Sequence, residues 1–483
     1  MTEKTKEHGY SHILKYTGIF GGVQMLSVIV GIVRNKFTAI FLGAAGMGLL
    51  SLFNSTVNML VSATNLGIPT SGVTEIARHY TENNHPSREL LDAISLIRSW
   101  AFLSALFGTL LCVMASPFLD TFSFSWGNHK LHYLLLAPIV GLTIIGAGET
   151  AVLKATRQLR SLIFSSLCVI IASLVVAVPV YWLWNVKGIL LVLFAQAFVQ
   201  MASALFLSIR RYPYRISLSF AMLRKGKTLI KLGVAFVVAG VCSTSSEFVV
   251  RSWLNTQGNL SVVGLFNAAS TLAIVYVGFV FSAMDSDYYP HLCAITDLRE
   301  QNVYVSRQVE VDLMLVGPLL QVLLFALPIL IPLLYNDSFL EMQTMVRLAL
   351  VSMIFKSVYI PIEYLPLAKG RGSVYLFQEV FAVLLLMAGE MLGFRLMQLA
   401  GIGIGFIVAY LVEMLFVLAY SRIYFGYILP LRTLSCFFQQ LVFVLLSFWI
   451  VVRFPFGFTC CLLGVLVCLS NVALTLFMAT KHR

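Results

Sequence analysis

Apolar segments about 20 residues long recur along the whole chain and are separated by short polar stretches. A bilayer core about 30 Å thick needs about 20 apolar residues for one helical crossing. The pattern therefore predicts an all-α polytopic membrane protein with about 14 transmembrane helices. The expected segments are residues 13–33, 44–66, 98–119, 131–153, 161–183, 188–208, 232–252, 262–284, 311–334, 345–368, 374–394, 401–420, 434–452 and 456–479.

Lys and Arg residues gather in every second loop between these segments. If the N-terminus is cytoplasmic, about 21 basic residues fall on inside loops and about 7 on outside loops. Because positive charge marks the cytoplasmic loops of membrane proteins, both termini are predicted to be cytoplasmic. The outside loops are all short, including the longest, which lies around residues 121–130.

Two short sequences repeat at matching places in the chain. A Val-Arg pair closes the first segment at 33–34 and the seventh at 250–251. Leu-Phe-Asn opens the second segment at 52–54 and the eighth at 265–267. Two halves that both start inside favour a parallel repeat with the substrate site between them. We therefore expect two six-helix lobes followed by two C-terminal helices.

The expected domain boundaries follow from this repeat. Residues 1–209 form the N-lobe, 232–421 the C-lobe, and 422–483 the C-terminal helices with a short cytoplasmic tail. The linker 210–231 combines alternating apolar residues with a basic cluster at 224–227. This pattern is typical of an amphipathic helix lying on the anionic inner leaflet.

Composition supports a membrane protein and excludes a nucleic-acid-binding one. Hydrophobic residues make up 59% and charged residues 11% of the 483 residues, and the mean hydropathy is +0.89. Soluble domains carry about a quarter charged residues, so extensive lipid contact explains the difference. The net charge of +12 reflects the inside loops, because the basic residues form no stripe interleaved with aromatic residues.

The sequence contains no motif for a catalytic, cofactor or metal site. The eight cysteines include no C-x-x-C pair and no Cys/His cluster at metal-ligand spacing. Gly226-Lys227-Thr228 resembles the end of a phosphate-binding loop, but Ala221 stands where the first glycine is required. We therefore expect no enzyme activity, catalytic residue, cofactor or metal. The polar N-terminus predicts no cleavable signal peptide.

Charged residues inside the apolar segments are the main candidates for function. Each costs about 2.5–3.5 kcal/mol on insertion scales, so such residues usually face a cavity or a partner. They are Glu149, Glu247, Lys356, Glu363, Glu379, Glu390 and Glu413. The alternative is a salt bridge between or within helices, and Glu247 and Arg251 have the i,i+4 spacing of such a pair.

Paired amides form polar stripes on two segments. Asn54 and Asn58 are four residues apart, as are Gln196 and Gln200. Amides at this spacing share a helix face, where they hydrogen-bond sugar hydroxyls in a cavity or join neighbouring helices. The glycines in residues 401–405 indicate close helix packing instead.

Three stretches, together with the helix plan, resemble a known superfamily of transporters. They read LGAAGMGLLSLFNS at 42–55, NLGIPTSGVTEIARHY at 65–80 and DSDYYPHL at 285–292. The chain resembles the multidrug/oligosaccharidyl-lipid/polysaccharide (MOP) flippase superfamily. Within it, the chain is most similar to the Wzx-type flippases for O-antigen and enterobacterial common antigen. Many Wzx proteins have twelve helices, so the fourteen expected here leave the exact glycan open.

The resemblance implies a central, partly cationic cavity between the two lobes. It also implies an undecaprenyl-pyrophosphate-linked oligosaccharide as substrate, moved from the cytoplasmic to the periplasmic leaflet of a bacterial inner membrane. Transport would proceed by alternating access with ion coupling. Membrane lipids and a polysaccharide polymerase machinery are the other expected partners.

The resemblance also suggests roles for the candidate residues. A cationic cavity pairs with the phosphates through Arg and Lys side chains, so we expect the pyrophosphate at Arg34, Arg251 and Lys356. The glycan would contact Asn54, Asn58, Gln196 and Gln200. The carboxylate that binds the coupling ion, a proton or a sodium ion, would be one of Glu149, Glu247 and Glu363.

Two rival functions remain open. A drug/cation antiporter of the MATE branch usually has an acidic residue in its first helix, and residues 13–33 contain none. A polyprenyl-linked glycosyltransferase or polymerase usually has a sizeable outside loop, and none is expected here.

Overall fold

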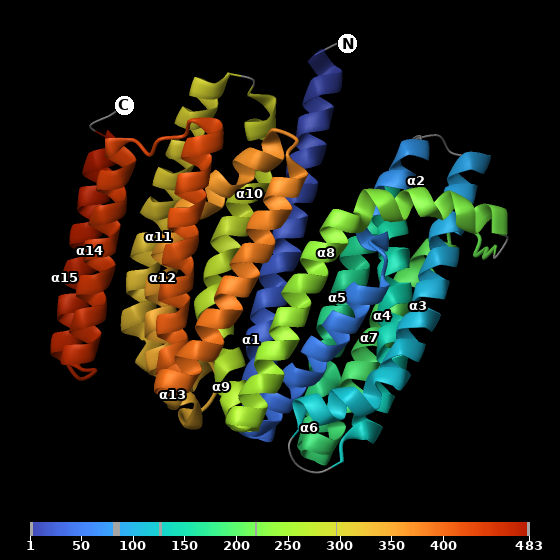
Figure 1. Ribbon diagram of the computed structural model, residues 1–483, viewed down its shortest axis with the longest axis horizontal. Helices are drawn as coiled ribbons and strands as arrows, with labels where there is room; N and C mark the ends of the chain where they lie inside the picture. The colour runs from blue at the N-terminus through green and yellow to red at the C-terminus, as the bar shows by residue number, and fades with distance from the viewer. Residues whose placement is uncertain (1–2, 81–86, 125–127, 218–219, 296, 481–483) are drawn as a thin grey trace. The chain divides into compact units, whose positions relative to one another are not determined.

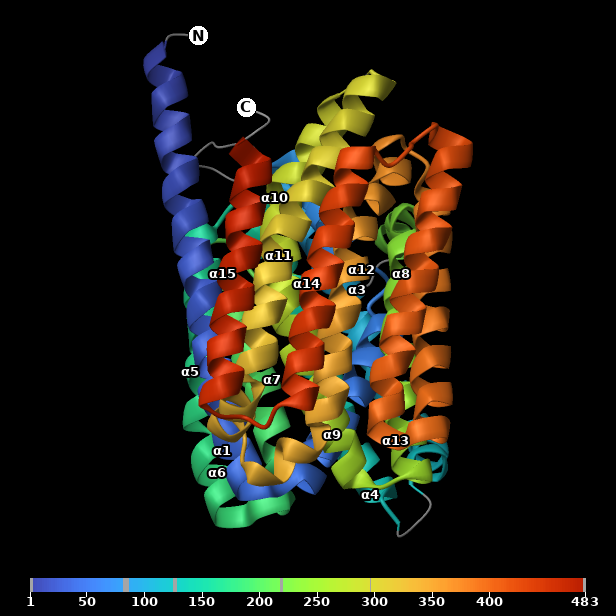
Figure 2. The same cartoon turned by 90° about the vertical axis from the view of Figure 1, so that its left-hand side faces the viewer.

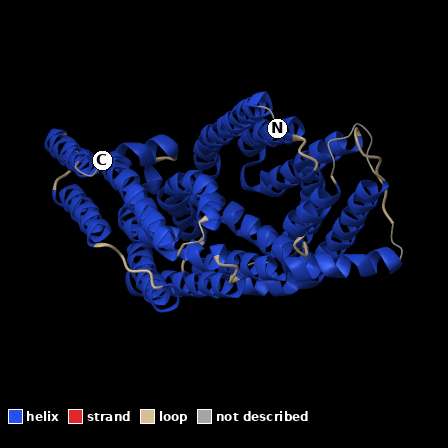
Figure 3. Cartoon of the chain, turned by 90° about the horizontal axis from the view of Figure 1, so that it is seen from above, coloured by secondary structure: helices blue, strands red, loops and turns tan. Residues whose placement is uncertain are grey.

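The computed structural model describes the backbone of residues 3–80, 87–124, 128–217, 220–295 and 297–480. Throughout these ranges every regular element is a helix, as Figure 3 shows. Contacts divide the chain into two units, Met1–Gly258 and Asn259–Arg483. Figure 1 gives the course of the chain through both units.

The first unit is built from long helices and a few short turns. Its elements are α1 (Glu3–Thr64), η1 (Ile68–Gly72), α2 (Val73–His79), α3 (Arg88–Ser123), α4 (Lys130–Ala155), α5 (Leu159–Val175), α6 (Ala177–Trp184), η2 (Asn185–Gly188), α7 (Ile189–Ile209) and α8 (Phe220–Gln257). Helix α4 packs between α3 and α7, and α8 packs against α1 and α3.

The second unit has the same general construction. Its elements are α9 (Leu260–Ser270), η3 (Thr271–Val275), α10 (Tyr276–Ala294), α11 (Leu298–Leu334), η4 (Asp337–Met342), α12 (Gln343–Ala368), α13 (Gly372–Phe425), α14 (Leu431–Arg453) and α15 (Phe458–Thr480). Helix α11 packs against α12, α14 and α15, and Figure 2 shows α11, α14 and α15 side by side.

The helices confirm the all-α membrane architecture predicted from the sequence. Ten helical runs in the described residues are long and apolar enough to cross a membrane. Two of these runs, Leu159–Ile209 and Gly372–Phe425, each contain two of the expected segments. The first two expected segments fall mostly within α1, and the seventh lies in α8. Large apolar side chains in the middle of helices, such as Leu110, Leu415 and Leu469, are exposed, as lipid contact requires.

Two of the long helices are pairs of crossings joined by a sharp turn. Helix α1 breaks at Gly43, where φ is 65° and ψ is −173°. Helix α13 breaks at Met397 and Gln398, where φ of Gln398 is 53°. Glycine reaches a positive φ without steric cost, whereas Gln398 must be held there by the packing around it.

Glycines allow the two halves of α13 to lie in direct backbone contact. A β-carbon on Gly401 would overlap the carbonyl of Gly393, and one on Gly405 would overlap the carbonyl of Gly389. A β-carbon on Gly403 would lie 3.0 Å from the carbonyl oxygen of Met345 in α12. The interpretation of residues 401–405 as a close-packing stripe is thus confirmed.

The linker between α7 and α8 differs in part from the expected amphipathic helix. Residues 210–217 form a non-helical connector that starts with a turn, and α8 begins at Phe220. That helix continues into the membrane segment, and Figure 1 shows the first part of α8 running crosswise to the rest. The side chains of the basic cluster at 224–227 lie outside the described residues.

The contact boundary also lies further along the chain than the expected start of the C-lobe. Helix α8 packs with the first unit, which ends at Gly258, whereas the sequence repeat assigns residues 232–421 to the C-lobe. Contacts group helices that touch, while a repeat groups helices of related origin. The lobe boundaries derived from the repeat stay a prediction.

Candidate functional site

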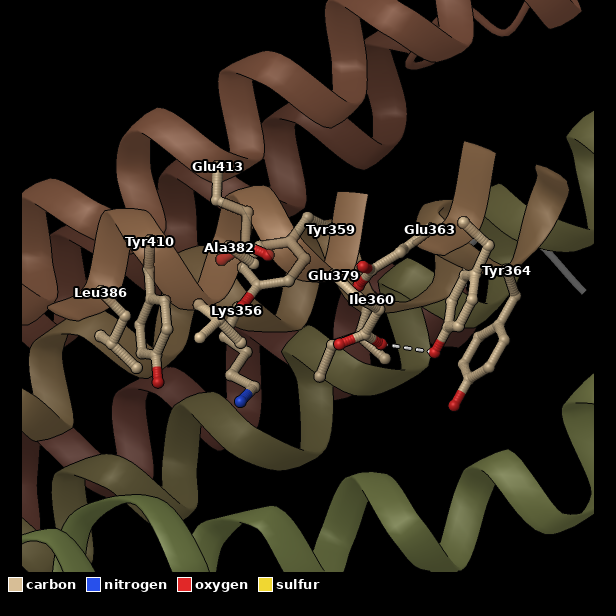
Figure 4. A pocket seen from close by; sticks show the side chains of 12 residues that line it. Lys356, Tyr359, Ile360, Glu363, Tyr364, Glu379, Ala382, Leu386, Tyr410 and Glu413 are labelled. Carbon is tan, nitrogen blue, oxygen red and sulfur yellow. Dashed lines mark hydrogen bonds between the residues drawn. The ribbon is translucent and has the colours of Figure 1, made fainter. Parts of the chain in front are cut away.

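A cavity of about 270 Å³ lies inside the second unit, between α12 and the two halves of α13. Its lining is a mixture of charged, hydroxyl and apolar side chains, shown in Figure 4. The lining residues are Lys356, Tyr359, Ile360, Glu363, Tyr364, Tyr375, Glu379, Ala382, Val383, Leu386, Tyr410 and Glu413.

Helical spacing explains why these side chains meet. Lys356, Ile360 and Glu363 recur at three- and four-residue intervals and therefore share one face of α12. Tyr375 and Glu379 lie on one face of the first half of α13. Tyr410 and Glu413, three residues apart, come from the second half. The turn at Met397 and Gln398 brings the two halves back against each other.

Lys356 is the cation of this cavity. Its ammonium nitrogen lies 5.1 Å from the centroid of the Tyr410 ring, a distance typical of a cation–π contact. The carboxylates of Glu363, Glu379 and Glu413 are near enough for their charges to act on it. Across the described part of the chain, Lys356 makes no salt bridge shorter than 4.0 Å.

Each of the three carboxylates has a tyrosine one helical turn before it. Glu379 accepts a hydrogen bond from the Tyr375 hydroxyl. Glu413 is buried at 5% exposure, and Tyr410 precedes it in the same half-helix. Glu363 follows Tyr359 on α12 in the same way. Three carboxyl groups and one ammonium group make the cavity rich in ionisable side chains.

The sequence predicted part of this site. Lys356 and Glu363 were both singled out, and the structure brings them into one cavity. Glu379 and Glu413 were recognised as intramembrane charges without an assigned role. The tyrosines were missed, although the repeated spacing of Tyr and Glu by three or four residues was a signal that could have found them.

A second polar surface lies in the first unit, where α8 meets α1. Arg251 donates a hydrogen bond from Nε to the Ser51 hydroxyl at 2.8 Å. Its Nη1 lies 3.1 Å from a carboxylate oxygen of Glu247, so the expected i,i+4 salt bridge is present. The Arg251 side chain is 14% exposed and that of Glu247 is 51% exposed.

The predicted amides Asn54 and Asn58 lie on the same face of α1 as Ser51. The three residues follow one another at three- and four-residue spacing, and both amides are exposed. Since Arg251 bonds Ser51, its guanidinium group lies beside this amide stripe. The structure therefore brings one predicted phosphate ligand and two predicted sugar ligands onto one surface.

The remaining predicted residues lie elsewhere in the first unit. Arg34 is half-buried on α1, and its carbonyl accepts a hydrogen bond from Thr38. Gln196 and Gln200 are half-buried on α7, which packs on α4 and α5. Glu149 is buried on α4 and forms an ion pair with Arg98, a residue that sequence reasoning did not single out.

Metal binding has no support in the described residues, where no group of three or more His, Cys, Asp or Glu side chains is arranged to hold an ion. The charged cavity instead offers proton-binding carboxylates, a fixed ammonium group and hydroxyls. Such groups, placed inside membrane helices, are characteristic of an ion or substrate pathway.

Comparison with known proteins relates this chain to a family of polysaccharide biosynthesis proteins. Residues 13–295 match a family model described as polysaccharide biosynthesis protein. The chain is 24% identical over 375 residues to proteins named lipid III flippase from Escherichia coli (strain K12) and Shigella flexneri. In each case 75% of this chain and 87% of the relative are covered.

Solved structures show the same fold at low sequence identity. The lipid II flippase MurJ, in an inward closed conformation, matches with a TM-score of 0.75 at 12% identity, over 96% of this chain and 99% of that chain. An inward-facing MATE family transporter of the MOP superfamily matches with a TM-score of 0.69 at 13% identity, over 83% and 94% of the two chains. The fold is thus the one that the resemblance to MOP transporters implies.

Proposed function

Because this chain belongs to the polysaccharide biosynthesis protein family, we propose that it is a flippase for a lipid-linked saccharide. The substrate would be an undecaprenyl-pyrophosphate-linked oligosaccharide, such as an O-antigen repeat unit. It would move from the cytoplasmic to the periplasmic leaflet of a bacterial inner membrane by alternating access. Both termini would lie in the cytoplasm, and a polymerase would receive the product.

The observation that carries the proposal is the presence of charged and amide surfaces inside helices otherwise suited to lipid. A pyrophosphate and a sugar chain cannot cross hydrocarbon unaided, because their desolvation is too costly. Arginine and amide side chains replace the water that these groups lose. The names of the lipid III and lipid II flippases agree with this reading.

Arg251 is the residue of the first unit best placed to bind the pyrophosphate. Its guanidinium group is partly exposed beside the amides Asn54 and Asn58, which are suited to sugar hydroxyls. Glu247 is its pairing partner and would release it when a phosphate arrives. Arg34, Gln196 and Gln200 stay secondary candidates for phosphate and glycan.

Lys356 is better suited to ion coupling than to the pyrophosphate. Three carboxylates share its cavity, so an anionic pyrophosphate would meet repulsion there. We therefore assign this cavity to the coupling ion, with Glu363, Glu379 and Glu413 as its acidic groups.

A proton is the coupling ion that this cavity favours. The ammonium group of Lys356 already supplies the positive charge that a sodium ion would bring to the carboxylates. Replacing Lys356 with Met removes that charge while keeping an unbranched side chain. Transport by the native chain should follow a proton gradient and ignore sodium, whereas Lys356→Met should bind ²²Na⁺ on the purified protein. Sodium-driven transport by the native chain would contradict this assignment.

Complementation tests the proposed function. The chain would be expressed in a bacterium that lacks its own O-antigen flippase, and surface glycan would be measured at matched protein level. Restored glycan supports lipid-linked saccharide export. If glycan is not restored by a well-inserted protein, a second strain lacking the lipid III flippase tests a different glycan. A drug-efflux assay in the same cells then tests the antiporter alternative suggested by the MATE-like fold.

A further inference from the structure

Arg98 is a buried cation whose guanidinium nitrogens all donate hydrogen bonds within the first unit. It lies on α3 with 2% exposure. Its Nε and Nη2 donate to the two carboxylate oxygens of Glu149 on α4, at 2.8 and 3.1 Å. Nη2 also donates to the Ser208 hydroxyl on α7 at 2.9 Å. One guanidinium group therefore joins three helices.

The same guanidinium group also holds the connector, which we define as residues 210–217. Nη1 donates to the carbonyl oxygen of Pro213 at 2.8 Å and to that of Tyr212 at 3.4 Å. The Tyr214 ring lies 5.0 Å from the guanidinium carbon. Three consecutive residues of the connector are thus bound to a single buried side chain.

Two further contacts fix the connector to the helices beneath it. The Ser217 backbone N–H donates to the Ser99 hydroxyl of α3 at 2.9 Å. The Tyr212 ring is 6% exposed and packs in an apolar cluster that includes Ile97 and Val152. Burial raises the pKa of the Tyr212 hydroxyl above its ordinary value. The connector is therefore docked at both its middle and its end.

We propose that Arg98 and Glu149 are positioning residues that make the connector a rigid part of the first unit. The connector leads into α8, so its docking sets the point from which α8 departs. On this view, the connector stays bound to α3 and α4 throughout the transport cycle, and bending takes place further along the chain. The statement about the cycle rests on the proposed function; the docking itself does not.

The geometry requires arginine in particular. A guanidinium group offers five N–H donors in one plane, which matches a carboxylate on one side and two carbonyls on another. A lysine has three donors on one nitrogen and cannot reach both sets. Arg98→Lys should therefore keep the charge but release the connector.

Limited proteolysis measures the docking directly. Arg210, Arg211 and Arg215 are exposed in the connector, so trypsin can cut there once the segment opens locally. Arg98→Lys should raise the cleavage rate by about tenfold, equivalent to about 1.4 kcal/mol of local stability. Arg78→Lys, the same change at an exposed ion pair with Glu75, is the matched control and should leave the rate unchanged.

A milder variant allows the docking to be tested even if Arg98→Lys misfolds. Ser99→Ala removes the acceptor for the Ser217 N–H and leaves the ion pair intact. It should also increase cleavage, by a smaller factor than Arg98→Lys. Native cleavage rates in both variants would overturn the docking proposal.

A disulfide tests whether the docked connector persists during transport. Cysteines at positions 99 and 217 should form a bond on oxidation, identified by mass spectrometry of the linked peptide, because these residues are in contact. Oxidised Ser99→Cys/Ser217→Cys should export glycan as well as the reduced protein does. Loss of export that is reversed by reductant would show that the connector must leave α3, and would overturn the proposal. If even the native chain exports no glycan, the proposed function fails while the cleavage rates still judge the docking.

Discussion

At the scale of residues, the role of a charged side chain inside the membrane depends on the groups that it contacts. Glu149 and Glu363 look alike in the sequence, since each is a single carboxylate in an apolar segment. In the structure, Glu149 is closed off by the fork of Arg98, whereas Glu363 lines a cavity with other ionisable groups. A carboxylate that is paired with a buried arginine has a structural role, whereas one that lines a cavity remains accessible to an ion.

The cavity carboxylates should be required for transport. Glu413→Gln keeps the size of the side chain but cannot take up and release a proton, so export should fall by about tenfold or more, a change of at least about 1.4 kcal/mol. Glu341→Gln, in an exposed position of η4, is the control and should export normally. Surface glycan at equal protein level is the measurement, and normal export by Glu413→Gln would remove this carboxylate from the proposed coupling site.

Arg251 should matter through its charge more than through its link to α1. Arg251→Gln removes a charge-assisted contact worth about 1.5–3 kcal/mol, so export should fall by about ten- to a hundredfold. Ser51→Ala removes only the interhelical hydrogen bond and should cost little. Arg453→Gln, at the exposed end of α14, is the charge-matched control. Equal losses in the Arg251 and Ser51 variants would indicate a structural role instead.

At the scale of elements, the backbone contact within α13 positions one wall of the cavity. Tyr375 and Glu379 are on one half of this helix, and Tyr410 and Glu413 are on the other. Their separation depends on how closely the halves approach, and that approach depends on glycines. The cavity is therefore sensitive to changes several turns away from it.

Gly393→Val should open the α13 hairpin. A β-carbon there would overlap the carbonyl of Gly401, so the halves would have to separate at a cost of about 1–3 kcal/mol or more. The melting temperature of the purified protein in detergent should fall. Gly31→Val is the matched control, because no atom lies within 4 Å of the added β-carbon in α1. Equal melting temperatures for both variants would contradict the packing described.

The sequence was a good guide to elements and a partial guide to the site. The expected segments are almost entirely helical, although 161–183 is divided between α5 and α6, because length and hydropathy are local properties that the bilayer enforces. Lys356 and Glu413 are 57 positions apart, and nothing local indicates that they share a cavity. Arg98 is the first residue of an apolar segment, so the sequence predicts an exposed residue at the end of a loop. In the structure its side chain is buried.

At the scale of the whole molecule, the distribution of basic residues predicts the orientation in the membrane. Two native cysteines can report it, since Cys293 at the end of α10 and Cys461 at the start of α15 are both exposed. With cytoplasmic termini, Cys461 should lie toward the periplasm and Cys293 toward the cytoplasm.

A membrane-impermeant maleimide should label Cys461 in intact spheroplasts and leave Cys293 unlabelled until the membrane is broken. Cys461→Ser should abolish the label in intact spheroplasts, which identifies the thiol. Label on Cys293 in unbroken spheroplasts would reverse the predicted orientation, and with it the direction in which the proposed substrate moves.

The turn in α13 also decides how this part of the chain is made. The two crossings of α13 are joined only by the turn at Met397 and Gln398. So short a connection does not allow one crossing to insert into the bilayer well before the other. We therefore expect both halves to enter the bilayer together, as a hairpin. Insertion as a hairpin would carry Arg395, beside the turn, through the bilayer and would place Glu379, Glu390 and Glu413 within it. The orientation of the two crossings of α13 would then be set in a single step.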